Sequence, residues 1–153
     1  MVRAHQGAIR NFLRRLTQET ALADDLAQQC FLKAYKNRAR LREETAAKIW
    51  LFQIAYRAFL DHIRTQSRRR ELSESHLDEP LAEAPEGLKM DITRAMDSLP
   101  TECRAVVILC LAHGMSHSET AIATGLPLGT VKSHVARGKT KLRTFLSAYQ
   151  TVK

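Results

Sequence analysis

The sequence has little glycine, proline or cysteine. Six of its 153 residues are Gly and four are Pro, and this shortage of turn-forming residues argues against a turn-rich all-β fold. The three cysteines, Cys30, Cys103 and Cys110, are odd in number and lack CxxC spacing. We therefore expect no disulfide scaffold, and this cysteine usage favours a reducing, cytoplasmic location.

Long apolar runs are also absent. The longest unbroken run, Ala105 to Ala112, is far too short to cross a bilayer, and no charged-then-apolar leader opens the sequence, so we predict neither membrane insertion nor a secretory signal. Apolar residues make up 44% of the chain and charged residues 26%. That balance is typical of a folded protein, and the length fits one ordinary domain or two small ones.

Positive charge is in excess. Twenty-four Lys and Arg against sixteen Asp and Glu give a net charge of +8, which favours a polyanionic partner, either nucleic acid or an acidic membrane surface. Residues 1–70 carry +9, residues 71–90 carry −5 and residues 91–153 carry +4. The acidic stretch has few large apolar residues to offset the entropy of ordering it. We predict that 71–90 is a flexible linker between two domains, with a surface loop inside one domain as the alternative.

Both basic blocks have helical periodicity. Apolar residues recur at helical spacing within 9–16, 22–34, 49–63 and 92–99, with a break at 17–20, and no stretch alternates with period two. A further compact, buried helix is predicted over 106–111, ending at Gly114. The predicted fold is all-α, with two small helical domains.

The second block contains a helix-turn-helix pattern. Ser116 and Glu119 have the spacing of a capping box, and Gly125 and Pro127 end the helix that follows. A second helix is predicted from near Thr130, with a buried face formed by Val131, Val135, Gly138 and Leu142. Its outer face is basic, as in units that lay their second helix in the DNA major groove. A basic amphipathic helix whose charges are merely solvated is the alternative.

Several motifs of this block resemble a known family. Leu99-Pro100, the stretch 125–133 reading GLPLGTVKS, and Lys141-Leu142-Arg143 are similar to region 4 of bacterial extracytoplasmic-function (ECF) sigma factors. Two positions depart from the family pattern. Thr120 makes the first helix more polar than the usual Ile-Ala-x-Ile, and His134 replaces an Arg, which we expect to remove a positive charge near DNA.

The first block resembles region 2 of the same family. The matching stretches are 23–35 (ADDLAQQCFLKAY), 49–55 (IWLFQIA) and 61–64 (DHIR). The resemblance covers nearly the whole chain in the family's order. It implies region 2 at 1–70, the linker at 71–90 and region 4 at 91–153, in a non-catalytic sigma factor that directs core RNA polymerase to promoters.

The resemblance also implies contact residues in region 2. The surface that docks on the clamp helices of the largest polymerase subunit would include Asp25, Leu26, Gln28, Phe31 and Lys33. The −10 element would be held by Arg38, Arg40 and Arg42 in a base-capturing loop at 37–48, and by Arg57 and Arg64 after this loop.

Three positions or stretches of region 2 carry a further prediction or an alternative interpretation. Arg57 stands where the family usually has Asn, which predicts an altered −10 preference, because Arg prefers guanine acceptors or phosphate. For Arg64 and the basic run at 68–70, a solvated helix end is the alternative to phosphate contact. Trp50 is expected to pack in the core rather than to stack on a base.

In region 4 the resemblance implies contacts with the −35 element. Lys132, Ser133 and Ala136 are assigned to base edges, and Thr130 and Arg137 to phosphate or mixed contacts. Lys139 and Arg143 are weaker phosphate candidates. An anti-sigma factor is a further implied partner, and no small-molecule substrate is expected.

Other chemistries find little support. Cys110, His113 and His117 have a spacing that zinc could use, but Gly114 interrupts the segment and a fourth ligand is lacking, so no metal or cofactor is expected. No catalytic triad, P-loop or carboxylate pair is present, which leaves a nucleic-acid enzyme unsupported. The remaining alternative is a helix-turn-helix regulator that binds duplex DNA without polymerase.

Overall fold

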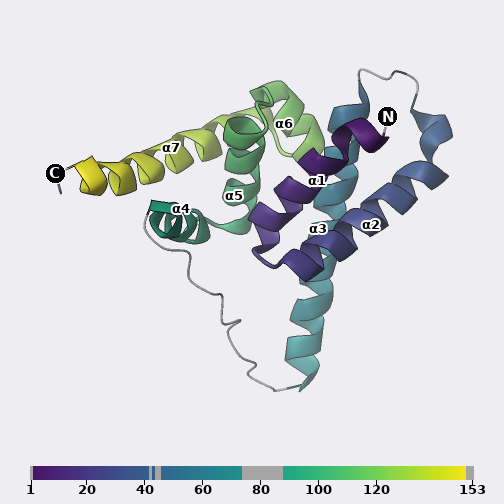
Figure 1. Ribbon diagram of the computed structural model, residues 1–153, viewed down its shortest axis with the longest axis horizontal. Helices are drawn as coiled ribbons and strands as arrows, with labels where there is room; N and C mark the ends of the chain where they lie inside the picture. Colours follow the sequence, from purple (N-terminus) through teal and green to yellow (C-terminus); the bar gives the residue numbers. More distant parts are fainter. Residues whose placement is uncertain (1, 42, 44–45, 74–87, 151–153) are drawn as a thin grey trace.

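The fold is helical throughout the residues that the computed structural model describes, which are 2–41, 43, 46–73 and 88–150. No strand occurs among them, so the predicted all-α class is confirmed. The N-terminal half consists of α1 (Val2–Thr17), α2 (Thr20–Lys36), the short 3-10 helix η1 (Arg38–Arg40) and α3 (Ala47–Ser73). The C-terminal half consists of α4 (Leu88–Asp97), α5 (Thr101–Val107), a π-helical turn η3 (Ile108–Ala112), α6 (His117–Thr124) and α7 (Leu128–Gln150) (Figure 1). Residues 74–87, which form most of the predicted linker, lie outside the described residues, and none of the described helices is suited to span a membrane.

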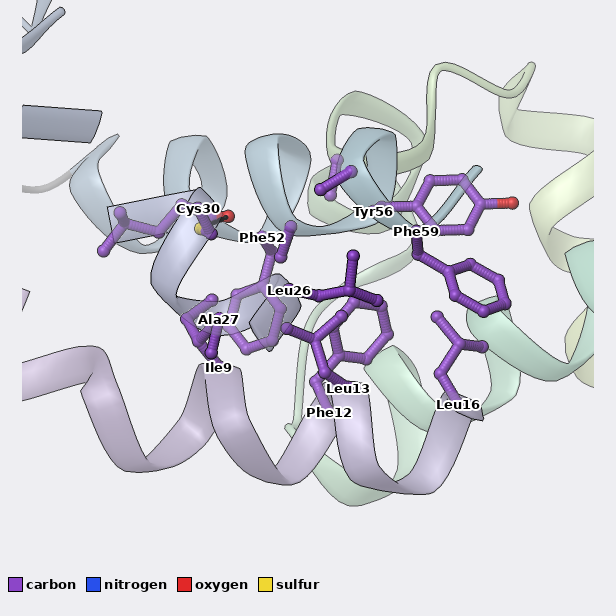
Figure 2. Packing of buried hydrophobic residues seen from close by; sticks show 14 of the residues in the cluster. Ile9, Phe12, Leu13, Leu16, Leu26, Ala27, Cys30, Phe52, Tyr56 and Phe59 are labelled. Atoms are coloured by element: carbon purple, nitrogen blue, oxygen red, sulfur yellow. Dashed lines mark hydrogen bonds between the residues drawn. The ribbon is translucent and has the colours of Figure 1, made fainter. Parts of the chain in front are cut away.

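The N-terminal half is a three-helix unit around an aromatic core. Phe12 of α1 and Phe52 of α3 are fully buried, and their rings meet edge to face with centroids 5.3 Å apart. Leu13, Leu16 and Leu26 surround them (Figure 2). The periodicity predicted these apolar stripes because side chains three and four residues apart share one face of a helix.

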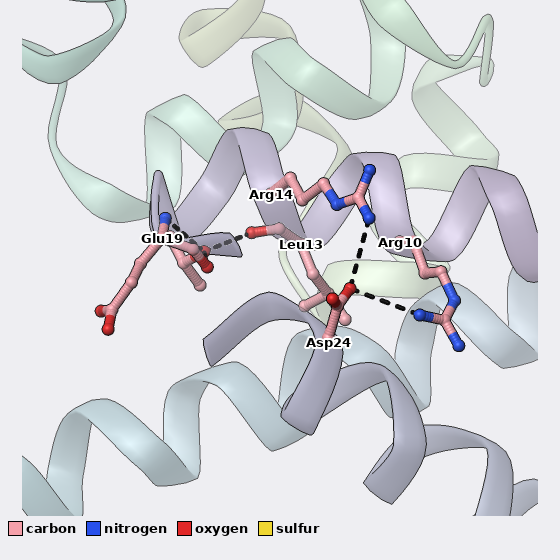
Figure 3. Close-up of polar contacts among 6 residues, drawn as sticks. Arg10, Leu13, Arg14, Glu19 and Asp24 are labelled. Atoms are coloured by element: carbon pink, nitrogen blue, oxygen red, sulfur yellow. Dashed lines mark hydrogen bonds and ion pairs between the residues drawn. The ribbon is translucent and has the colours of Figure 1, made fainter. Parts of the chain in front are cut away.

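A tight connection sets α2 against α1. The predicted break at 17–20 is confirmed, and Gln18 turns the chain with a φ of 58°. The Thr17 hydroxyl donates to the Leu13 carbonyl at 2.8 Å and accepts the Glu19 N–H at 3.2 Å. Asp24 accepts hydrogen bonds from Arg10 at 3.3 Å and from Arg14 at 3.4 Å (Figure 3). These bonds connect the first turns of α2 to α1.

The C-terminal half is organised around the start of α7. Val131 and Val135 are buried against Val106 of α5, as the predicted inner face required. Gly138 is buried beside Val107, and a Cβ added at position 138 would collide with the Val107 Cγ2 atom. The absence of a side chain at position 138 therefore lets α5 and α7 approach closely. Beyond this contact Leu142 packs against Leu99 and Cys103, and the C-terminal end of α7 then extends away from the rest of the molecule (Figure 1).

The predicted buried helix at 106–111 changes its pitch before it ends. The His113 N–H donates to the Ile108 carbonyl at 3.2 Å and the Met115 N–H donates to the Leu109 carbonyl at 3.1 Å. This wider turn rotates Leu111 toward solvent, where 47% of it is exposed, so the prediction that it is buried is wrong. Gly114, with a φ of 63°, ends the segment as predicted.

The two halves share one hydrophobic core. Residues of the C-terminal half, among them Ile108, Leu109 and Ala123, belong to the same buried cluster as Phe12 and Phe52. Helix α6 packs along α3, and η3 packs on α1. The linker pattern in the sequence predicts two domains, and the structure adds that they are docked together.

Candidate nucleic-acid interface

The helix-turn-helix pattern forms the local structure that the sequence predicts. The Ser116 hydroxyl accepts the Glu119 N–H at 3.0 Å, and the Glu119 carboxylate accepts the Ser116 N–H at 2.9 Å, which completes the capping box. Gly125 ends α6 with a φ of 76° and donates its N–H to the Ala121 carbonyl at 2.9 Å. Helix α7 begins at Leu128, two residues before the predicted start.

The capping box provides a stability test. We expect Ser116→Ala to lower the free energy of unfolding by about 1 kcal/mol, because the first turn of α6 loses a hydrogen-bond acceptor. Hydrogen bonds to the Glu119 carboxylate from the Ser116 backbone N–H, and then from the Ser116 side chain, hold the pKa of Glu119 below its usual 4.5. Their contribution is therefore complete above that value and is lost as the pH falls through the lower pKa of the folded state. Urea unfolding at several pH values measures both effects; the exposed Ser118→Ala is the control, and an equal loss in both variants would contradict the prediction.

One face of α7 presents the predicted recognition residues to solvent. Lys132, Ala136, Lys139 and Arg143 follow one another at spacings of four, three and four, and all are exposed. Ser133 and Arg137 are exposed beside this face, and Thr130 is half-buried.

A hollow of about 400 Å³ lies between the start of α6 and this face. It is lined by Ser116, His117 and Ser118 on one side and by Lys132 and Lys139 on the other. Hydroxyl and ammonium donors that converge on a concave surface suit an anionic backbone.

His134 does not lie on the exposed face. The residue is 9% exposed, and its side chain points toward α5, where its Nε2 atom is 3.1 Å from the Glu102 carboxylate. Position 134 follows the buried Val131 by three residues, so it shares the inner side of α7. The expectation that this histidine removes a charge near DNA is therefore wrong.

The other departure from the family pattern is accommodated in the core. Thr120 is fully buried, and its hydroxyl lies 3.2 Å from the Cys110 thiol. This contact satisfies the hydroxyl inside an otherwise apolar layer.

The cysteine and histidine spacing does not form a ligand cluster. Among the described residues, no group of three or more His, Cys, Asp or Glu side chains is placed to hold a metal ion. His113 instead points into the other half, where its ring packs beside Phe12 and Phe52.

Helix α2 carries an exposed surface with apolar and charged groups. Asp25, Gln28 and Lys33 are exposed and Phe31 is half-buried, as a contact surface requires. Leu26 is the exception: only 1% of it is exposed, and it packs in the core near Leu13 (Figure 2). Its assignment as a polymerase contact is wrong, because its helical position faces α1 and α3.

Sequence reasoning missed two residues of this surface. Leu32 and Tyr35 are 63% and 62% exposed, unusual values for large apolar side chains on a packed helix. Leu32 borders a groove of about 460 Å³ between α2 and α3. The signal was available in the sequence for Leu32, because this position falls on the side of α2 opposite the alanines that are buried.

The predicted −10 residues lie on two elements. The Arg38 guanidinium stacks over the Tyr35 ring, 4.0 Å from its centroid, and Arg40 is exposed in η1. Arg57 and Arg64 are exposed two turns apart on α3. Arg42 lies outside the described residues.

The C-terminal end of α6 borders the α3 arginines. Arg57 and Arg64 line a hollow of about 300 Å³ together with Thr124 and Gly125. In this arrangement the region 2 surface predicted to bind DNA is therefore flanked by the other half. Trp50 is half-buried and packs against the shared core, which agrees with the expected packing role.

Comparison with known proteins assigns both halves. Residues 1–69 match the family described as Sigma-70 region 2, and residues 89–142 match Sigma-70, region 4. The ECF RNA polymerase sigma factor SigM of Mycobacterium tuberculosis is 33% identical over 91% of this chain and 72% of its own length. The chain belongs to the ECF sigma factor family. Members of this family are DNA-binding transcription-initiation factors.

Other relatives agree with this assignment. The ECF sigma factor SigE of Mycolicibacterium smegmatis is 32% identical over 99% of this chain, which spans 62% of that relative's length. The sigma factor CarQ of Myxococcus xanthus is 31% identical over 93% of the chain and 84% of its own length.

Solved structures share the arrangement of both halves. The sigma factor RpoE of Bartonella quintana, crystallised with the anti-sigma factor NepR, superposes with a TM-score of 0.81 at 27% identity, covering 95% of this chain and 94% of that one. CnrH, solved with the cytosolic domain of CnrY, has a TM-score of 0.68 over 96% of this chain and 85% of its own, and at 24% identity this likeness concerns the fold alone.

Proposed function

We propose that this ECF sigma factor binds core RNA polymerase and directs it to promoters through contacts with both the −10 and the −35 element. The observation that carries the proposal is the presence of two distinct surfaces in one chain. One is the exposed face of α2, which combines apolar and charged side chains. The other is the basic face of α7, which follows α6 and its capping box in the helix-turn-helix. A regulator of duplex DNA alone would use only the second.

Region 4, proposed to comprise residues 91–153, reads the −35 duplex with α7. Lys132, Ser133 and Ala136 reach base edges, while Thr130 and Arg137 make phosphate or mixed contacts. Lys139 and Arg143 continue the same exposed face and neutralise phosphates. Lys and Arg suit these roles because they donate to guanine acceptors and to the charged backbone.

Region 2, proposed to comprise residues 1–70, holds the −10 element as it opens. Removing a base from the stack costs a few kcal/mol, which positively charged and aromatic groups offset by binding the displaced strand. Arg38 and Tyr35 supply such a pair beside Arg40, and Arg57 and Arg64 extend the positive surface along α3.

The polymerase contact is assigned to α2. Asp25, Gln28, Phe31 and Lys33 contribute to it, and Leu32 adds the apolar centre that protein interfaces usually have. An anti-sigma factor is the second proposed partner, in line with the complex in which RpoE was solved.

Promoter binding requires the halves to separate. The −10 and −35 elements are about 25 base pairs apart, or roughly 85 Å at about 3.4 Å per base pair. Helices α3 and α6 are in direct contact here, so the docked form cannot reach both elements at once. We propose that residues 71–90 link the halves when they separate.

A pull-down with core polymerase that lacks its own specificity subunit tests the proposal. We expect polymerase to retain the wild-type chain and not the Leu32→Glu variant. We also expect the reconstituted complex to produce promoter-dependent transcripts. Binding to promoter duplex without retention on polymerase would instead identify a stand-alone helix-turn-helix regulator.

The α7 lysines separate base contacts from phosphate contacts. We expect Lys132→Ala to weaken binding to the preferred −35 sequence by about 1–3 kcal/mol and to relax the choice of base there. Lys139→Ala should weaken binding to all sequences alike and flatten the slope of log K against log salt by about 1. Fluorescence anisotropy of the reconstituted complex on a −35 variant series measures both. Lys141→Ala, on the side of α7 near Cys103, is the control, and identical effects of Lys132→Ala and Lys139→Ala would contradict the assignment.

A further inference from the structure

His113 connects the two halves through both its side chain and its backbone. The imidazole packs beside Phe12 of α1 and Phe52 of α3, with ring centroids 6.1 Å and 5.1 Å away, and completes a cluster of three rings. The Lys48 ammonium at the start of α3 donates to the His113 carbonyl at 3.3 Å. One residue of the C-terminal half thus contacts two helices of the N-terminal half, within the core that the halves share.

The surroundings of this ring disfavour a positive charge. The Nε2 atom is buried, and no described residue offers it a hydrogen-bond partner. The charged groups that act on it are Arg15 of α1 and Lys48 of α3, both cations, and no described carboxylate pairs with it. Burial first, and then these two cations, lower the pKa of His113 below its usual 6.5.

Protonation of His113 would be unfavourable in these surroundings for two reasons. An imidazolium must carry a hydrogen on Nε2, where no acceptor is available, and burying such a group unpaired is unfavourable. It would also place a third positive charge beside Arg15 and Lys48. Attraction to the two phenyl rings opposes these costs only in part, since the net effect on the ring is to favour its neutral form.

We propose that His113 is a proton-sensitive latch, which holds the halves together when neutral and releases them when protonated. Opening exposes the ring to water, where its pKa returns to the ordinary range. Because the open form then binds protons more tightly, the closed form is favoured at neutral pH and loses stability as the pH falls through about 6.5. Each pKa unit of difference between the two forms changes the ratio of open to closed molecules by about tenfold once the pH is below both values.

The latch would act on the surface proposed to bind the −10 element. The end of α6 that borders Arg57 and Arg64 belongs to the half that His113 anchors. Release would move the end of α6 away from these exposed arginines and free region 4 to move. The inference concerns the chain without polymerase or DNA, so its failure would leave the proposed function untouched.

Small-angle X-ray scattering of the full chain at pH 7.5 and pH 5.5 tests the latch. We expect the radius of gyration of the wild type to increase at the lower pH while its helical circular dichroism stays constant. His113→Phe, which keeps an aromatic ring but cannot be protonated, should remain compact at both pH values. His5→Gln, which removes a titratable histidine of α1, should behave as the wild type does.

A second measurement keeps the test independent of any folding defect in the variant. Nuclear magnetic resonance of the wild-type chain follows the His113 ring directly, and its protonation should share its midpoint with the expansion. An unchanged wild-type radius, an expansion that persists in His113→Phe, or an expansion accompanied by loss of helix would each overturn the proposal.

Discussion

Replacing Phe52 with alanine is expected to lower the free energy of unfolding by about 3–5 kcal/mol, the usual cost of emptying a buried phenylalanine site. Phe52 is fully buried, meets Phe12 edge to face at 5.3 Å and also contacts His113. Part of the loss is the aromatic pair, worth roughly 0.5–1.5 kcal/mol beyond its buried area. The substitution should therefore weaken the N-terminal core and the contact between the halves together.

Urea unfolding followed by the fluorescence of Trp50, the single tryptophan, measures this loss in the helix that carries Phe52. Leu72→Ala, on the same helix but 86% exposed, is the control and should change stability by less than about 0.5 kcal/mol. Domains of this size are stable by only about 5–15 kcal/mol, so the expected loss is a large fraction of the total. A change below about 1 kcal/mol would show that the core can collapse around the cavity.

Gly138→Ala is expected to destabilise the C-terminal half, although alanine is the better helix former. Alanine gains about 1 kcal/mol over glycine in a helix interior, whereas overpacking a well-filled core costs about 1–3 kcal/mol. The collision is with Val107, a buried, β-branched residue that cannot swing aside. The cost of overpacking should therefore exceed the gain in helix propensity, with a net loss of up to about 2 kcal/mol.

A double-mutant cycle identifies the cause of this loss. In a Val107→Ala background the collision disappears, so Gly138→Ala should become neutral or stabilise by up to about 1 kcal/mol. Gly7→Ala in α1, where an added Cβ meets nothing within 4 Å, is the control and should stabilise in both backgrounds. Thermal and urea unfolding measure the four stabilities. A loss of the same size with and without Val107 would contradict the close contact as its origin.

Local structure was predicted well because its causes are local. The break at 17–20, the capping box of Ser116 and Glu119, and the left-handed Gly125 all depend on residues a few positions apart. The inner face of α7 followed from spacing alone, since Val131 and Val135 lie one turn apart.

The errors concern which side of a helix faces which neighbour. Leu26 was placed on the polymerase surface, but its direction is decided by α1 and α3 packing over it. His134 was placed near DNA, yet it sits on the edge of the inner face of α7, where Glu102 of α5 reaches it. Leu111 was expected in the core, and the π-helical turn rotates it outward. Each outcome depends on contacts between residues far apart in the sequence.

The sequence by itself determined the helices, their ends, the basic face of α7 and the family, because periodicity, capping residues and the GLPLGTVKS stretch are properties of neighbouring residues. The tertiary structure decided that the halves share a core, that His113 enters the aromatic cluster of the other half, and that α6 lies beside Arg57. These features depend on the fit of apolar surfaces that are distant in the chain, and no pattern within either half specifies that fit.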